Sequence, residues 1–195
     1  MNPLRGRVEW VRWLMGRYRP EDRRVLEDVV LQRYRRNPNF ARILFVGVAG
    51  YVRHYPRMFA EQTFVTIDPS LRRAPFGGRW HIRDRVENLG AYFAPSYFDA
   101  VVMNGVIGWG LNDLPAVERA ITVCHQHLRS GGELLLSTDA DKPCHGQLAQ
   151  VRALSSGFVP APLPTLGTPQ YTTHVPWHEK SEHVFLFFQK RSPLA

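Results

Sequence analysis

One stretch of the sequence, residues 43–70, restricts the possible folds of this chain more than any other. A short apolar run at residues 43–46 leads into Gly47-Val48-Ala49-Gly50-Tyr51, and a second apolar run at residues 64–67 ends at Asp68. Such runs suit strands that are buried on both faces, and glycines allow the backbone to turn sharply beside a ligand. Asp68 follows Gly47 by about 20 residues, the offset at which an acid after the second strand meets ribose hydroxyls. The stretch therefore predicts a strand, turn, helix and strand that bind an adenosine-type ligand.

The rest of the chain alternates predicted strands with predicted helices. Strands are predicted at residues 43–46, 64–67, 80–83, 98–103, 133–137 and 184–188, and helices at residues 53–60, 114–128 and 146–154. This alternation is typical of an α/β fold in which helices cover both faces of a mostly parallel sheet. A chain of 195 residues can bury one sizeable core. We therefore expect one α/β domain at residues 40–195, preceded by an N-terminal helical cap at residues 1–39.

Basic residues gather at the start of the chain. Residues 1–42 contain eleven arginines and five acids, and the whole chain has a net charge of +8. Pro20 followed by two acids predicts a helix start, Asn37-Pro38 predicts its end, and an amphipathic piece at residues 9–18 could close over a pocket. The arginines fit a cap that packs on the domain and covers substrate, a solvated helical face, or a surface that binds nucleic acid. We favour the first, because phosphate binding needs the arginines on one surface.

Composition gives no sign of a membrane protein or of a disulfide framework. The uncharged, proline-rich residues 153–173 read as loop and strand, the apolar residues 100–112 are too few to cross a bilayer, and residues 1–7 lack the apolar core of a secretory signal. We therefore expect a cytoplasmic protein with no membrane partner. Cys124 and Cys144 have no metal-ligand spacing, so we expect two ordinary thiols and no metal site.

Four segments, taken in their order and spacing, resemble one known family. They are residues 43–50, 64–68, 98–104 and 128–136. Together they resemble the class I S-adenosylmethionine-dependent methyltransferases, over roughly residues 40–190. The resemblance implies a Rossmann-like sheet of seven strands whose last strand is antiparallel, with residues 157–162 and 183–188 forming the terminal hairpin. It also implies S-adenosyl-L-methionine as the cofactor.

The resemblance implies cofactor contacts at the ends of the predicted strands. The implied residues are Gly47, Val48, Ala49, Gly50 and Tyr51 in the loop, Asp68 at the ribose, Asp84 and Arg85 at the adenine edge, and Asn104 and Gly105 beside the methyl group. A polar step such as Asp84 after a strand could equally cap a helix. Two positions depart from the family pattern: Phe45 stands where the family has an acid, and Tyr51 stands where it has its last loop glycine.

Catalysis of methyl transfer requires few residues. The methyl donor is already activated, so the protein chiefly holds a nucleophile in line with it and, for some acceptors, removes a proton. His174 and His178, in a loop before the last predicted strand, are the candidate bases, and Asn104 is a candidate hydrogen-bonding group. The candidate substrate contacts are His54, Tyr55, Trp109 and Trp13. Core packing explains Trp109 almost as well, and an ordinary helix-surface pair explains His54 and Tyr55.

The sequence thus predicts an S-adenosylmethionine-dependent methyltransferase whose acceptor is a small molecule, such as a specialised metabolite. Three other interpretations stay open. The N-terminal arginines could serve a nucleic-acid methyltransferase, in which binding would weaken steeply with salt. The cofactor could instead support a different reaction, or the fold could belong to a binding protein without catalysis, since fold alone does not establish function.

Overall fold

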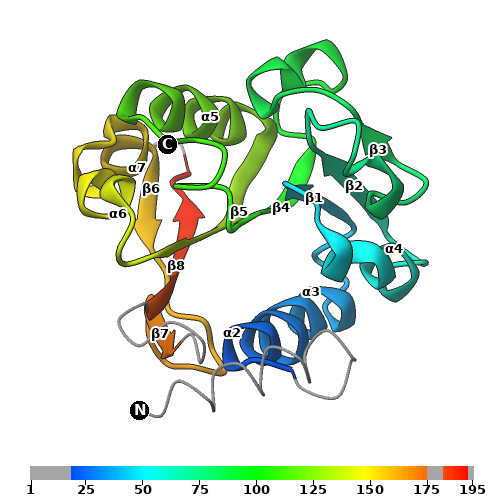
Figure 1. Cartoon of the computed structure of the whole chain (residues 1–195), viewed down its shortest axis with the longest axis horizontal. Helices are drawn as coiled ribbons and strands as arrows, with labels where there is room; N and C mark the ends of the chain where they lie inside the picture. The colour runs from blue at the N-terminus through cyan, green and yellow to red at the C-terminus, as the bar shows by residue number, and fades with distance from the viewer. Residues whose placement is uncertain (1–18, 175–181, 193–195) are drawn as a thin grey trace.

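The computed structural model describes residues 19–174 and 182–192, and its centre is a sheet of eight strands (Figure 1). The strands are β1 Arg42–Val46, β2 Thr63–Ile67, β3 His81–Ile82, β4 Phe98–Asn104, β5 Leu128–Asp139, β6 Phe158–Pro160, β7 Gln170–His174 and β8 Glu182–Lys190. Their order is β3-β2-β1-β4-β5-β8-β6, and β7 pairs with β8 off this path. The first five strands of that order run parallel, whereas β8 is antiparallel to β5. The mostly parallel sheet with an antiparallel last strand is confirmed.

Helices cover both faces of this sheet. The N-terminal helix runs without a break through α2 Glu21–Arg24, a π-helical segment Val25–Leu31 and α3 Gln32–Arg36. The other helices are α4 Tyr55–Met58, α5 Leu114–His127, α6 Pro143–Gln147 and α7 Arg152–Gly157, with 3-10 turns at Gly50–His54, Ala74–Phe76, Val86–Ala91 and Leu148–Gln150. In Figure 1, α5 lies on one side of the sheet, and α2 and α3 lie on the other.

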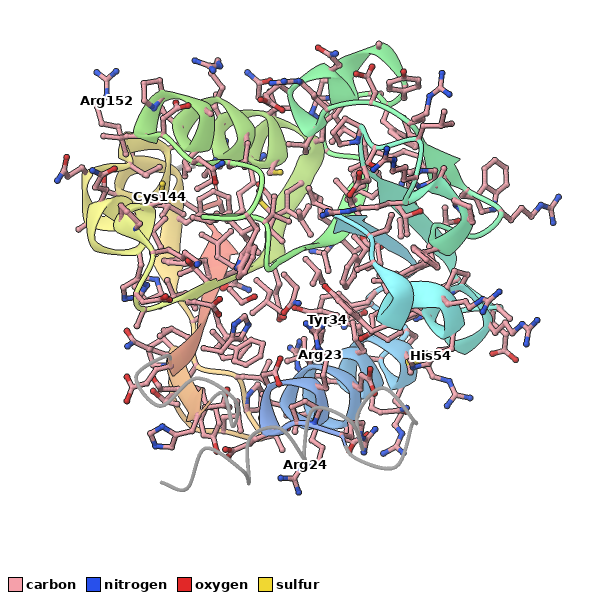
Figure 2. All side chains as sticks on the ribbon, viewed as in Figure 1. Arg23, Arg24, Tyr34, His54, Cys144 and Arg152 are labelled. Atoms are coloured by element: carbon pink, nitrogen blue, oxygen red, sulfur yellow. The ribbon has the colours of Figure 1, made fainter. Side chains whose placement is uncertain are left out.

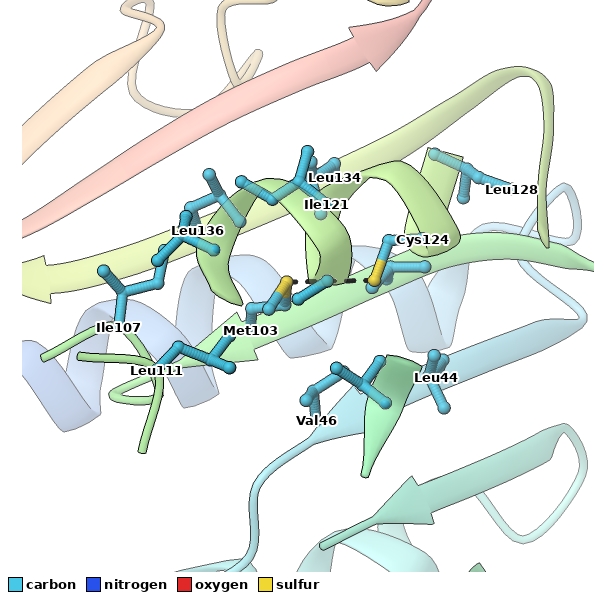
Figure 3. Close-up of a cluster of buried hydrophobic side chains, with 14 of the residues drawn as sticks. Leu44, Val46, Met103, Ile107, Leu111, Ile121, Cys124, Leu128, Leu134 and Leu136 are labelled. Carbon is cyan, nitrogen blue, oxygen red and sulfur yellow. Dashed lines mark hydrogen bonds between the residues drawn. The ribbon is translucent and has the colours of Figure 1, made fainter. Parts of the chain in front are cut away.

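Each of the central strands contributes side chains to two separate cores, because successive residues of a strand point to opposite faces. In β1, Leu44 and Val46 pack with α5, and Figure 3 shows this cluster around Ile121 and Cys124. Ile43 and Phe45 pack on the other face, in the cluster that contains the N-terminal helix. Burial on both faces explains why these strands are apolar runs rather than alternating ones.

The N-terminal helix is fixed to the sheet by polar contacts as well as apolar ones. Arg33 donates two hydrogen bonds to Glu133 at the start of the buried part of β5, at 2.5 and 2.6 Å. Leu26, Val30 and Tyr34 are buried against the sheet. The first described helix therefore shares a core with the α/β domain.

Three local predictions differ from the structure, and one of them is the helix predicted at residues 146–154, which is divided among α6, the 3-10 turn Leu148–Gln150 and α7. The helix predicted at residues 53–60 is a 3-10 turn followed by the four residues of α4. The strand predicted at residues 133–137 begins earlier, at Leu128, because the helix ends at His127 and the chain becomes extended at once, with a register shift between Phe98 and Ala100. Strand β7 was not predicted, because no apolar run marks it and three of its five residues are exposed.

Both cysteines are buried and unpaired, as expected. The Cys124 thiol lies 3.8 Å from the Met103 sulfur (Figure 3), and burial raises the pKa of Cys124 to about 12, so it stays protonated. Within residues 19–174 and 182–192, no helix is long and apolar enough to cross a membrane. The same residues contain no cluster of three or more His, Cys, Asp or Glu side chains that could hold a metal ion.

Candidate cofactor-binding site

A cavity of about 480 Å³ opens at the carboxyl ends of the parallel strands, where α/β sheets bind their ligands. Residues from five adjacent strands or the loops after them line it: Ile67 and Asp68 from β2, Val46 and Gly47 from β1, Asn104 and Gly105 from β4, Asp139 from β5 and His183 from β8. Asp22 and Arg23 of α2 complete the wall. The cavity therefore lies between the carboxyl ends of the parallel strands and the N-terminal helix.

The glycine-rich loop is held in place by the acid at the end of β2. Gly47 has a φ of +80°, which a side chain would strain, and an added Cβ would lie 2.8 Å from Val106. The Val48 N–H donates to Asp68 Oδ2 at 3.0 Å, and the Ser70 N–H donates to Asp68 Oδ1 at 2.8 Å. Asp68 is buried yet lines the cavity. A carboxylate has about four acceptor positions, so Asp68 can hold the loop and still bind hydroxyls.

The end of β4 leaves an unused donor and an open space. The Ser137 hydroxyl donates to Asn104 Oδ1 at 2.8 Å, which fixes the orientation of the amide. Asn104 Nδ2 is buried and, among the described residues, has no hydrogen-bond partner. Gly105 has a φ of +62°, and a Cβ added to it would meet no atom within 4 Å. Both features suit a ligand that approaches the backbone closely and accepts one hydrogen bond.

A charged pair from the N-terminal helix lies over the loop. The Arg23 guanidinium stacks on the Tyr51 ring, 3.5 Å from its centroid, and the Arg23 Nε lies 3.3 Å from Asp22 Oδ2. Figure 2 shows Arg23 pointing from α2 toward the sheet, whereas Arg24 points away from it. Arg23 Nη1 is buried without a hydrogen-bond partner in the part of the chain that the structure describes. The pair thus presents one guanidinium nitrogen that lacks a hydrogen-bond partner among the described residues, next to a carboxylate.

A second polar group lies at the far end of the cavity. The His183 ring nitrogen Nδ1 lies 2.6 Å from Asp139 Oδ1, and Trp109 Nε1 donates to Asp139 Oδ2 at 3.0 Å. Although burial raises the pKa of Asp139, the hydrogen bonds from His183 and Trp109 outweigh it and hold that pKa below its ordinary value. Asp139 therefore stays ionised at neutral pH.

The cavity brings together most of the residues that the sequence pointed to. Nine of them line it: Gly47, Val48, Ala49, Tyr51, Asp68, Arg85, Asn104, Gly105 and Trp109. Five others do not line it: Gly50, Asp84, His54, Tyr55 and His174. Trp13 and His178 lie outside the described residues, so their roles stay predictions.

The residues away from the cavity have other contacts or face solvent. Asp84 accepts from Asn88, the Arg85 N–H and Tyr92, and these hydrogen bonds hold the pKa of Asp84 below its ordinary value. It therefore bonds groups within its own turn, although it is not the N-cap of the 3-10 helix Val86–Ala91. His54 is exposed beside α4, and His174 is exposed at the end of β7.

Tyr55 has a buried structural contact. Its ring is fully buried, and its hydroxyl donates to Glu27 Oε1 of the N-terminal helix at 2.9 Å. Burial raises the pKa of Tyr55, so the hydroxyl keeps its proton. Tyr55→Phe is expected to lower the free energy of unfolding by about 1–3 kcal/mol, because a buried carboxylate loses a donor. Urea unfolding measures this loss, and an unchanged unfolding free energy would contradict the contact.

Several residues in the cavity wall were not expected from the sequence, namely Asp22, Arg23, Ser70, Arg73, Glu87 and His183. The N-terminal pair reaches the loop only through tertiary packing, so local spacing gives no signal for it. His183 had a usable signal. Pairing the last strand antiparallel to β5 puts His183 directly opposite Asp139.

No protein-family model matches the sequence, and no curated protein sequence matches it significantly. Solved structures match its fold. The N-methyltransferase NodS from Bradyrhizobium japonicum WM9 is 15% identical with a TM-score of 0.61, over 83% of this chain and 93% of NodS. A second NodS structure, in complex with S-adenosyl-L-homocysteine, matches with a TM-score of 0.58.

Two other solved structures that match the fold have names that describe a different reaction or a different substrate. The [4+2]-cyclase SpnF is 14% identical with a TM-score of 0.62, over 86% of this chain and 80% of SpnF. An rRNA methylase from Streptococcus thermophilus is 13% identical with a TM-score of 0.56, over 83% of this chain and 94% of the methylase. The strand order, the loop after β1 and these matches agree: the chain has the fold of the class I S-adenosylmethionine-dependent methyltransferases.

Proposed function

We propose that the protein is a methyltransferase that uses S-adenosyl-L-methionine and acts on a small-molecule acceptor. One observation carries the proposal. The cavity holds an acid at β2, an open glycine and unused amide donor at β4, and a charged pair from α2. These groups match, in order, the ribose, the methionyl chain and the amino-acid end of the cofactor.

The ribose end fits the acid at β2. Asp68 is buried at the cavity wall, and Arg73 Nη1 lies 3.7 Å from its Oδ2. Hydrogen bonds from hydroxyls to a carboxylate are stronger than those to a neutral acceptor. Arg85 and Val86 line the cavity next to this position and would border the adenine ring.

The amino-acid end fits the charged pair of the N-terminal helix. The family has an acid at the position of Phe45, but Phe45 is fully buried and packs on Tyr55, with ring centroids 5.5 Å apart. Asp22 supplies a carboxylate for the ammonium group from a different element, and Arg23 supplies a cation for the carboxylate. The Tyr51 ring, in place of the last loop glycine, supports the Arg23 guanidinium.

The bound cofactor would supply an activated methyl group, and this chain's residues bind and orient the two reactants. Asn104 Nδ2 is a fixed donor at the end of β4, held by Ser137. Five apolar residues, Val46, Ile67, Val86, Val106 and Leu111, line part of the wall and would reduce the access of water to a bound acceptor. Positioning and water exclusion together account for much of the rate in reactions of this type.

The placement of the arginines favours a small acceptor over nucleic acid. Arg33 pairs with Glu133, Arg19 with Glu27 and Asp28, and Arg42 and Arg129 with Asp99. Arg23 lies in the cavity wall. Four of the seven arginines between residues 19 and 42 are therefore paired with acids, which leaves fewer unpaired cations for phosphates.

Isothermal titration with S-adenosyl-L-homocysteine tests the cofactor assignment. We expect saturable binding with one site per chain, because the product differs from the cofactor only by the methyl group. A folded sample that shows no heat of binding, and no competition between S-adenosyl-L-homocysteine and S-adenosyl-L-methionine, would overturn the proposal. Product mass then separates methyl transfer, which adds one methyl group to the acceptor, from a rearrangement of the kind that the name of SpnF describes.

The nucleic-acid alternative has its own measurement. Fluorescence anisotropy with a labelled RNA oligonucleotide, at low and moderate salt, reports the number of phosphate contacts through the steepness of the salt dependence. We expect weak binding with a shallow dependence. Tight binding with a steep dependence would favour the nucleic-acid function.

A further inference from the structure

The far end of the cavity contains an unused proton acceptor. We propose that His183 is a general base for the methyl acceptor, that Asp139 positions it, and that the acceptor carries a hydroxyl group. This inference rests on the proposed methyltransferase function and deepens it, because it assigns a proton-transfer residue and a substrate class to the same cavity.

The geometry fixes which ring nitrogen is available. His183 Nδ1 lies 2.6 Å from Asp139 Oδ1, and an ionised carboxylate only accepts, so the proton of the neutral ring lies on Nδ1. Nε2 then carries a lone pair. It is buried and has no hydrogen-bond partner among the residues that the structure describes. His183 is also a lining residue of the cavity, so an acceptor hydroxyl that reaches Nε2 would supply the missing donor.

The surrounding elements hold this arrangement. On β5, Asp139 lies directly opposite His183 and also accepts from Trp109, whose ring carries Lys142 Nζ at 4.3 Å from its centroid. On β7, Thr173 lies opposite His183 and its hydroxyl bonds the His183 backbone oxygen at 3.4 Å. On β8 itself, the His183 and Phe185 rings meet edge to face. Asp22 and Arg23 are the charged groups that α2 adds to the cavity wall.

The strand order puts this base on the acceptor side of the cavity. Five consecutive strands of the sheet, in the order β2, β1, β4, β5 and β8, each contribute one residue to the cavity from the strand or the loop after it. In the same order these residues are Asp68, Gly47, Asn104, Asp139 and His183. Neighbouring strands are about 4.8 Å apart, so His183 is roughly 10 Å further along the sheet than Asn104. The ribose and methionyl groups of the cofactor would lie at the ends of β2, β1 and β4, and the acceptor would lie beside β5 and β8.

The base identifies the chemistry of the acceptor. Thiols and carboxylic acids lose their protons near or below neutral pH, whereas a phenolic hydroxyl has a pKa of about 10 and needs a base. An ammonium ion would need one too, but it would place a second positive charge next to the sulfonium of the cofactor, whereas a hydroxyl group adds none. In the reaction, Nε2 takes the hydroxyl proton, the oxygen lone pair forms the new O–C bond, and the electrons of the broken C–S bond stay on sulfur. The imidazolium then releases its proton to water.

Nuclear magnetic resonance tests the inference on the protein without cofactor. Long-range proton–nitrogen correlation at about pH 8, above the ordinary histidine pKa of about 6.5, reports which ring nitrogen carries the proton. We expect His183 with a proton on Nδ1 and none on Nε2. The His183→Gln variant assigns the signals, and His174→Gln on the neighbouring strand serves as the matched control. A proton on Nε2 would overturn the proposal.

Phenol and anisole then probe the acceptor position in the complex with S-adenosyl-L-homocysteine. They share a ring, but only phenol carries a hydroxyl proton. We expect phenol to shift the Nε2 resonance of His183 and anisole to leave it in place. Equal shifts, or none, would contradict the assignment.

Measurements of kcat and of ligand affinity distinguish a failure of this inference from a failure of the proposed methyltransferase function. With S-adenosyl-L-methionine and phenol, His183→Gln should lower kcat by about 100-fold while the dissociation constant of S-adenosyl-L-homocysteine changes less than about twofold. Asp139→Asn should lower kcat less and shift the ring proton toward Nε2, whereas His174→Gln should change neither value. If the wild-type protein fails to bind S-adenosyl-L-homocysteine, the proposed function fails. If it binds, and His183→Gln keeps full kcat, only the base assignment fails.

Discussion

Asp68→Ala is expected to weaken the binding of S-adenosyl-L-homocysteine by about 1000-fold. Two hydrogen bonds from ribose hydroxyls to the carboxylate contribute about 2 kcal/mol each, and a loss of about 4 kcal/mol corresponds to that factor. The alanine also releases the Val48 N–H, which loosens the loop that the ligand contacts. Isothermal titration measures the change. Asp68→Asn keeps one acceptor oxygen and should give an intermediate loss.

The chain offers a matched control for this variant. Asp99 is also a buried carboxylate, and it accepts from the Arg42 N–H at 2.8 Å and from Arg129 Nε at 2.9 Å. It lies at the amino end of β4, whereas the cavity lies at the carboxyl ends of the strands. Asp99→Ala should therefore lower the melting temperature without changing the affinity. Equal losses of affinity in both variants would mean that Asp68 acts through overall stability.

The central sheet could be predicted from the sequence because its strands are buried on both faces. Residues 43–46 are all apolar, and residues 98–103 are apolar except for Asp99; each segment lies in a strand whose residues pack into two cores. Strand β7 could not be predicted in this way. Only Thr173 of its five residues is buried, and the strand exists because β8 offers it a partner.

The residues of the candidate site also fall into two groups, those that local sequence predicts and those that it does not. The loop after β1 and the acid after β2 lie within one strand–turn–strand unit, so spacing along the chain was enough to place Gly47 and Asp68 in one cavity. Arg23 and His183 enter the wall from the N-terminal helix and the last strand. Their contacts join residues far apart in the sequence, Arg23 with Tyr51 and His183 with Asp139, and no local pattern encodes them.

Arg23→Leu is expected to lower the affinity for S-adenosyl-L-homocysteine by about 100-fold. Its Nη1 is buried without a partner in the described part of the chain, so a ligand carboxylate would form a charge-assisted hydrogen bond there. Removing one partner of such a buried pair costs about 3 kcal/mol. Leucine keeps apolar contact with the Tyr51 ring. Isothermal titration of the two proteins measures the difference.

A shortened ligand separates recognition from folding in this experiment. 5′-Methylthioadenosine retains the adenosine and the sulfur but lacks the amino-acid end, so its affinity should be the same for the wild-type protein and for Arg23→Leu. Arg24→Leu is the matched control, because Arg24 is the next residue and points away from the sheet (Figure 2). It should bind both ligands normally. If Arg23→Leu weakens both ligands equally, the guanidinium holds Tyr51 and the loop in place rather than the ligand carboxylate. If it weakens only the longer ligand, the N-terminal helix supplies the recognition that the buried Phe45 cannot provide.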